Sequence, residues 1–251
     1  MLYMIIGALL VGVSLGLMGS GGSILTVPIL TFVLGQQEKV AIASSLAIVG
    51  GICLVAGVPY VIKKQVDFRS VLFFGLPGMV GAFGGALMSK HVSGLVQLVV
   101  FALVMLLAGG MMLRGQDLTA AAPLARRRSW KVILDGLAVG ALTGFVGVGG
   151  GFMIVPALVL LGGLSMHRAV GTSIFIIALK SASGFAGYLK VLDERGLSLD
   201  WKVIGVFVLM GSLGSFAGTQ IGTRLPQAAL RKSFAYFLLV MGAYVIWHSV
   251  R

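Results

Sequence analysis

Long apolar stretches separated by short polar junctions run the length of the chain. Uncharged runs such as 2–34, 40–62 and 70–89 are long enough to cross a bilayer, whose hydrocarbon core of about 30 Å needs roughly 20 helical residues. The pattern therefore predicts an all-α polytopic membrane protein. The predicted helices cover residues 2–18, 24–34, 40–62, 70–89, 94–113, 132–146, 152–161, 168–191, 201–222 and 230–248. These ten helical segments make about eight spans, because two of them are too short to cross alone.

The two short segments, 24–34 and 152–161, each follow a cluster of glycines. At about 1.5 Å per residue they are roughly 15 to 17 Å long, about half the hydrocarbon thickness. A glycine cluster interrupts a helix, and irregular backbone at membrane depth is tolerated only where protein or a water-filled cavity covers it. We therefore expect two half-spans beside two helix breaks.

The two clusters are copies of one pattern, which indicates an internal duplication. A shift of 128 residues brings Gly19, Gly21, Gly22, Pro28 and the run 43–45 onto Gly147, Gly149, Gly150, Pro156 and the run 171–173. A shift of 133 residues brings Gly81 and Gly85 onto Gly214 and Gly218, two pairs whose spacing is typical of close helix packing. We predict a first repeat at 1–113, a basic linker at 114–131 and a second repeat at 132–251.

Composition excludes a soluble protein, because 58% of the 251 residues are hydrophobic and 10% are charged. The net charge of +12 lies at the ends of apolar segments, where it orients a protein in the lipid bilayer, so no nucleic-acid partner is expected. Cys53 is the single cysteine, so neither a disulfide nor a cysteine-based metal site is predicted, and no cofactor motif is present.

The basic linker is expected on the cytoplasmic side of a bacterial inner membrane, since it carries Arg114, three consecutive arginines at 126–128 and Lys131. If each broken element crosses once, the two halves are parallel; if it is a hairpin, they are inverted. Lysine and arginine divide 12 inside and 6 outside in both cases. The charge rule thus leaves the symmetry open, while both alternatives place the two termini on one side.

The glycine clusters are the first candidate site for chemistry. Free backbone N–H groups and the positive end of a short helix favour an anion, and two breaks at matching repeat positions indicate a transporter site. The alternative is that the glycines serve only close packing. Neither cluster completes a nucleotide-binding motif. The proposed substrate-binding residues are Gly19, Ser20, Gly21, Gly22, Ser23, Gly147, Gly149, Gly150 and Gly151.

Polar groups near the breaks extend this candidate site. Ser44, Ser45, Thr172 and Ser173 open the next helix of each half and can turn hydroxyls toward a break, or bond back to their own helix. Pro28 and Pro156 lie inside the short helices, where each removes a backbone donor and shapes the break or merely kinks the helix.

Lys180 is the sharpest single candidate, because it stands in the middle of an otherwise uncharged segment. An intramembrane charge is costly and is a functional hypothesis by default, as an anion counter-charge or a proton-linked group. The alternative is a lysine that snorkels to an interface. Its repeat partner is Ile52, so its role is carried out once per chain.

The duplicated glycine cluster, the proline after it and the small polar start of the next helix resemble the TauE/SafE family. The resemblance covers nearly the whole chain and implies a polytopic inner-membrane transporter of small sulfur oxyanions or organosulfonates, often drawn with eight spans. The resemblance implies that the six matching glycines, the two prolines and the four hydroxyl residues named above form the site. Ser20 and Ser23 depart from the family's glycine pattern.

We therefore expect a gradient-driven secondary transporter of a small anion, because no ATP site is present. The alternative is a passive anion channel. An enzyme is not expected, since no intramembrane acid–base pair is visible. Assembly into a homo-oligomer is left open.

Overall fold

Apolar runs form helices wherever the structure is described. The computed structural model describes residues 2–19, 22–114, 129–147, 154–155, 158, 164, 166–222, 224 and 226–250. Its elements are α1 (Leu2–Met18), α2 (Gly22–Pro28), η1 (Ile29–Val33), α3 (Glu38–Ile62), α4 (Phe68–Ser70), η2 (Val71–Gly75), α5 (Leu76–Met88), η3 (Ser89–His91), α6 (Gly94–Arg114), α7 (Ser129–Val146), α9 (Met166–Glu194), α10 (Trp201–Gly222) and α11 (Gln227–Val250). Every element in these ranges is helical, η1 and η2 being π-helical and η3 a 3-10 turn.

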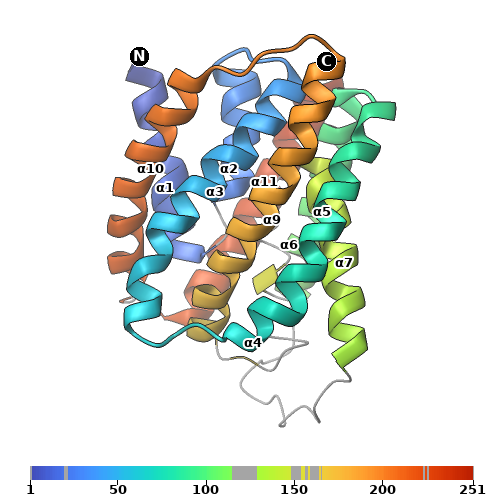
Figure 1. Ribbon diagram of the computed structural model, residues 1–251. Coiled ribbons are helices and arrows are strands. Elements are labelled where there is room, and N and C mark those ends of the chain that lie inside the picture. The colour runs from blue at the N-terminus through green and yellow to red at the C-terminus, as the bar shows by residue number, and fades with distance from the viewer. Residues whose placement is uncertain are drawn as a thin grey trace.

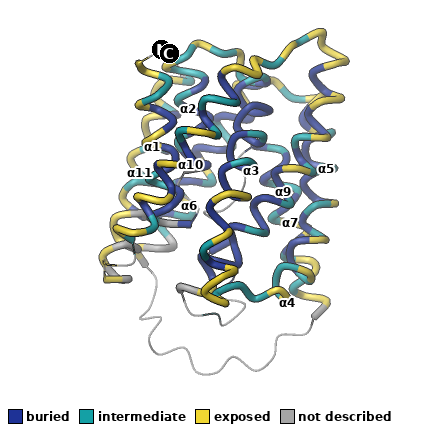
Figure 2. The backbone as a smooth tube through the Cα atoms, turned by 60° about the vertical axis from the view of Figure 1, so that its left-hand side comes forward, coloured by how far each residue is buried: buried dark blue, intermediate teal, exposed yellow. Residues whose placement is uncertain are grey.

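Several helices meet the length and hydropathy that a membrane crossing requires. They are Glu38–Ile62, Phe68–His91, Arg168–Glu194 and Trp201–Gly222, and shorter apolar helices lie at Leu2–Leu17, Gly94–Gly110 and Ala235–Ser249. Large apolar side chains cover the outer surface, where Figure 2 shows the outward-facing tube as exposed and the inner tube as buried. The all-α polytopic membrane fold expected from the sequence is thus confirmed, while eight spans stays a prediction.

The first break is a hairpin. Gly19 ends α1 in a left-handed conformation, φ +68°, and its N–H donates to the Leu15 carbonyl at 2.7 Å. In Figure 1, α1 descends from the N-terminus at the upper end, and α2 returns to the upper end, where α3 begins. The short segment runs from Gly22 to Val33, against the expected 24–34. Pro28 lacks an N–H, and α2 gives way there to the π-helical turn η1.

Among the described helices that follow, α3, α6 and α10 descend, whereas α5, α7, α9 and α11 ascend (Figure 1). Both termini lie at the upper end, whereas α6 ends and α7 begins at the lower end. Contacts between helix ends agree with this order: the Arg195 guanidinium donates to the Lys90 carbonyl at 2.7 Å at the upper end, and the Asp67 N–H donates to the Thr172 hydroxyl at 2.9 Å at the lower end. Since α1 descends and α7 ascends, the directions are those that inverted halves require.

Helices from the two sequence halves pack against each other rather than within their own half. The main pairs are α1 with α10, α7 with α5, α3 with α9 and α6 with α11. Two of these pairs approach so closely that glycine is required at the contact. A Cβ at Gly12 would lie 2.0 Å from the Gly211 carbonyl oxygen, and one at Gly140 would lie 2.2 Å from that of Gly78.

The same contacts recur at the residue offsets of the sequence comparison. Gly16 meets Ser215 as Gly144 meets Ala82, and the predicted packing pairs behave alike: Gly214 and Gly218 meet the α1 backbone, while Gly81 and Gly85 meet the α7 backbone. The close packing expected of these glycine pairs is therefore confirmed. The division into repeats and linker stays a prediction, with most of the linker outside the described residues.

Substituting a contact glycine is expected to destabilise the protein, whereas substituting an open one is not. A Cβ at Gly144 would lie 2.0 Å from the Ala82 carbonyl oxygen, so Gly144→Ala must separate α7 from α5, at a cost of about 1 to 3 kcal/mol. Gly84, on α5, has nothing within 4 Å of its Cβ position, so Gly84→Ala should be neutral or gain up to about 1 kcal/mol of helix propensity. Melting temperatures in detergent compare the two, and equal shifts would contradict the packing account.

Candidate functional site

The first helix break is held by α9. The Ser173 hydroxyl donates to the Gly19 carbonyl at 3.4 Å and to the Val170 carbonyl, one turn earlier on its own helix, at 2.8 Å. A Cβ at Gly19 would lie 2.5 Å from a Val170 methyl carbon, so α9 fits tightly against the turn. The end of α1 thus depends on a helix from the other half of the chain.

The second break is held in the same way by α3. Gly147 is also left-handed, φ +74°, and its N–H donates to the Thr143 carbonyl at 2.8 Å. The Ser45 hydroxyl donates to the Gly147 carbonyl at 2.5 Å, and a Cβ at Gly147 would lie 1.8 Å from an Ile42 methyl carbon. Ser45 and Ile42 stand 128 residues before Ser173 and Val170, so the two contacts match.

The helix ends that meet at the first break carry opposite partial charges. Helix α1 brings its carbonyl end, with a partial negative charge, to the place where α2 begins with its partial positive end. The two dipole ends offset each other to first order, so the break attracts an anion less than an isolated helix start would. The described contacts join each break to the opposite half, and none joins Gly19 to Gly147.

The other predicted site residues are distributed around these contacts. Thr172 accepts a hydrogen bond from the Asp67 N–H, and Ser23 is buried in α2. Ser44 is buried, and its hydroxyl has no hydrogen-bond partner among the described residues. Gly22 begins α2 and Pro28 ends it. Ser20, Gly21, Gly149, Gly150, Gly151 and Pro156 lie outside the described residues.

Lys180 lies at the centre of α9, fourteen residues from Met166 and fourteen from Glu194. Its side chain is 1% exposed, and its Nζ has no hydrogen-bond partner among the described residues. At about 1.5 Å per residue, each end of the helix is roughly 21 Å away, which is beyond the reach of a lysine side chain. The buried ammonium therefore reaches neither end of α9.

The Lys180 side chain points toward η2 and α5. Its Nζ lies 4.5 Å from the centre of the Phe74 ring, within the range of a cation–π contact. A Cβ at Gly78 would lie 2.0 Å from Cε and 2.9 Å from Nζ, so the end of the lysine side chain lies directly against this glycine. Phe74 belongs to the π-helical turn η2, and such turns are frequent at functional sites.

A buried polar network that the sequence analysis missed holds the end of α7. Helix α7 ends at Val146, so its last carbonyls lack intrahelical donors. The Gln97 amide donates to the Phe145 carbonyl and, at 2.6 Å, to the Tyr188 hydroxyl, which itself donates to Phe145 at 3.0 Å. The sequence does carry a signal for this network, because Gln97 is the one amide side chain in an otherwise apolar helix.

Lys39 completes this network from the start of α3. Its ammonium donates to the Ser89 carbonyl at 2.6 Å and to the Gln97 side-chain oxygen, and the side chain is 4% exposed. The ammonium therefore polarises the amide that caps α7, as a cation near a helix C-terminus does. Sequence position suggested only a boundary residue, because Lys39 follows Glu38 directly.

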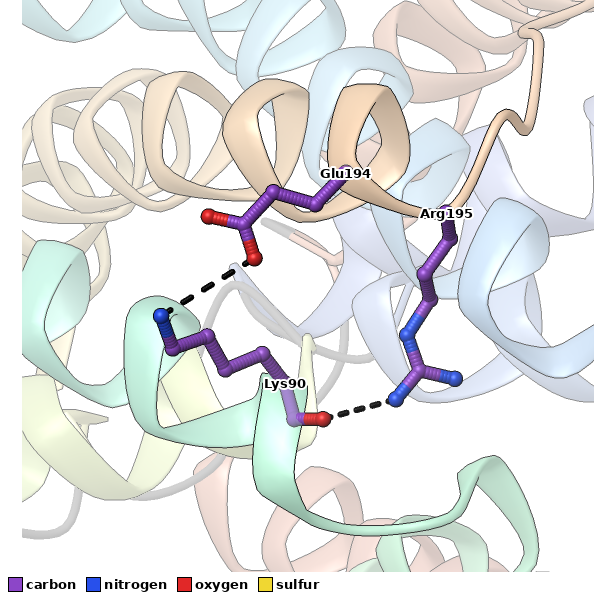
Figure 3. A network of polar contacts seen from close by, with 3 residues as sticks. All are labelled: Lys90, Glu194 and Arg195. Carbon is purple, nitrogen blue, oxygen red and sulfur yellow. Dashed lines mark hydrogen bonds and ion pairs between the residues drawn. The ribbon is translucent and has the colours of Figure 1, made fainter.

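Above this network, exposed charges join η3 to the end of α9 (Figure 3). Lys90 Nζ lies 3.8 Å from Glu194 Oε2, and the Arg195 guanidinium donates to the Lys90 carbonyl. Both side chains of the ion pair are exposed, so the pair contributes little to stability.

The long apolar helices and the close packing of the two sequence halves define an all-α polytopic membrane protein. The family model described as "Sulfite exporter TauE/SafE" matches residues 4–245, and the chain belongs to this family. It is 34% identical to a "Probable membrane transporter protein" of Xylella fastidiosa strain 9a5c, over 96% of this chain and 92% of the relative.

More distant relatives carry similar names. The chain is 26% identical to "Probable membrane transporter protein YunE" of Bacillus subtilis, over 98% of this chain and 97% of the relative, and 24% identical to "Probable membrane transporter protein MJ0441" of Methanocaldococcus jannaschii, over 97% and 94%. No solved structure matches the chain. The protein is thus an integral membrane protein with the family and relatives of a transporter rather than of an enzyme.

Removing the Gln97 amide should destabilise the α7 break. Gln97→Leu leaves Lys39 with one acceptor and the Phe145 carbonyl with one donor, and buried polar groups that lose a partner cost about 1 to 3 kcal/mol. Gln37→Leu is the matched control, because Gln37 is exposed and its side chain makes no capping bond. Melting temperatures in detergent should fall for Gln97→Leu alone, and equal values would contradict a structural role for the network.

Proposed function

We propose that this protein is a secondary transporter of small anions, with sulfur oxyanions or organosulfonates as its substrates and Lys180 as the counter-charge. The observation that carries the proposal is the Lys180 ammonium, which is fully buried at the centre of α9 without a hydrogen-bond partner among the described residues. An unpaired charge in such a place is costly, and a bound anion would compensate it.

The family supports the choice of anion. Its model is described as a sulfite exporter, and small sulfur oxyanions are pyramidal or tetrahedral groups that accept several hydrogen bonds. Backbone N–H groups of the two glycine clusters and the unpartnered Ser44 hydroxyl are the donors we assign to the anion beside Lys180. An ion or proton gradient is the driving force in this proposal.

We further propose that the end of the bundle with the linker faces the cytoplasm. Among the described residues, the helix ends and loops of this lower end carry nine lysines and arginines, at positions 63, 64, 69, 114, 131, 168, 224, 231 and 232. The upper end carries five, at positions 39, 90, 190, 195 and 202. Basic residues are enriched in cytoplasmic loops, so the two termini face the outside of a bacterial inner membrane.

Reporter fusions test this orientation. A fusion before Met1 and a fusion after Arg251 should both report an external location, and an insertion between Arg114 and Ser129 should report the cytoplasm. An insertion at Gly35, which lies in the connection before α3 and has nothing within 4 Å of its Cβ position, should also report the outside. Termini found on opposite faces would contradict the hairpin form of the breaks.

Replacing Lys180 tests the site. Charge-assisted contacts contribute about 1.5 to 3 kcal/mol each, so Lys180→Met should weaken anion binding roughly tenfold to a hundredfold and reduce uphill transport in liposomes. Lys202→Met is the matched control, since Lys202 is exposed at the upper end. Unchanged binding and unchanged uphill flux in Lys180→Met would refute the assignment, and flux that never runs uphill in the unmodified protein would instead favour a channel.

A further inference from the structure

We propose that the protein selects substrates that carry one negative charge and rejects dianions of the same shape. This inference rests on the proposed function, because it takes Lys180 as the counter-charge. It concerns the charge state of the substrate, which neither the family nor the names of the relatives specify.

Among the residues whose burial the structure describes, the interior offers a single cation that is free to compensate a ligand. Lys39 and Lys180 are the buried basic side chains of the described part of the chain. Lys39 already donates to the Ser89 carbonyl and to Gln97 near the upper end, whereas Lys180 donates to nothing described. Between the two ends of the chain, the undescribed residues within the two halves, 20–21, 148–153, 156–157, 159–163, 165, 223 and 225, contain no lysine or arginine in the sequence.

The repeat position equivalent to Lys180 is occupied by isoleucine. Ile52 is the residue of the first half that corresponds to Lys180, 128 positions earlier. It packs on α10 as Lys180 packs on α5: a Cβ at Gly211 would lie 2.4 Å from the Ile52 terminal carbon, and a Cβ at Gly78 would lie 2.0 Å from Lys180 Cε. Two equivalent slots in the fold therefore hold one charged and one neutral side chain.

A single ammonium in the interior favours a substrate with one negative charge over a substrate with two. An ammonium and a monoanion form a neutral pair, whereas a dianion leaves one uncompensated negative charge in a poorly solvated interior, where such a charge is costly. At the first break the dipole of α2 does not supply the missing charge, because the carbonyl end of α1 meets the positive start of α2 there.

Methanesulfonate and sulfate make a matched pair of probes, because both are tetrahedral, similar in size and fully ionised at neutral pH, with charges of −1 and −2. Binding of each sodium salt to the purified full-length protein is measured by calorimetry at constant ionic strength. We expect methanesulfonate to bind at least tenfold more tightly than sulfate. In Lys180→Met we expect methanesulfonate to lose that advantage.

A second variant adds the missing charge. Ile52→Lys places an ammonium in the slot on α10 and should raise the affinity for sulfate relative to methanesulfonate at least tenfold, whereas Ile52→Met should leave the preference unchanged. Should Ile52→Lys fail to fold, the preference of the unmodified protein still decides. Equal or tighter sulfate binding that Lys180→Met abolishes would overturn the charge selectivity and leave the proposed function standing. No binding of either anion would overturn both.

Discussion

Hydrogen bonding at the two helix breaks is the constraint on which the rest of this structure depends. A helix that stops inside a membrane leaves carbonyls with no donor and no water nearby, and each unpaired group is costly there. The Ser45 hydroxyl donates to the Gly147 carbonyl, and the Ser173 hydroxyl donates to the Gly19 carbonyl. In each case the donor belongs to the opposite half of the chain. Neither break is complete without the helix that the opposite half contributes, so the two halves must assemble together.

Contacts between opposite halves of the chain also determine the helix packing. Helices α1 and α7 end at the breaks, and each lies against a helix of the opposite half, α10 or α5, at a distance that only glycine permits. Backbones that approach so closely gain van der Waals contact, which is the main source of helix association where no hydrophobic effect acts between helices. A rigid contact of this kind next to a turn fixes the position of the break relative to α3 and α9.

Much of this arrangement follows from the sequence, and the remainder has physical reasons. Apolar length predicted the helices, and α1 and α10 begin and end where expected because Gly19 and the apolar-to-polar changes mark their limits. The hairpin form of the first break was left open, since charge counts fit both symmetries. Lys39 and Gln97 were missed, because a lysine at a helix start looks exposed until the tertiary structure brings Ser89 onto it. The anion site itself stays a prediction, with six of its proposed residues outside the described part of the chain.

Lys180 is best understood against its counterpart in the first half. If packing alone determined the residue at this slot, an apolar side chain would suffice, because Ile52 fills the equivalent slot on α10 and is fully buried there. A lysine fits the slot on α5 only with its ammonium on the Phe74 ring and without a hydrogen-bond partner among the described residues, an arrangement that is less stable than a packed apolar side chain. The slots on α5 and α10 thus make equivalent contacts, and the slot on α5 holds the unfavourable charge of Lys180. In the proposed function, such a charge at the midpoint of α9 is explained by the anion that it binds rather than by what it stabilises.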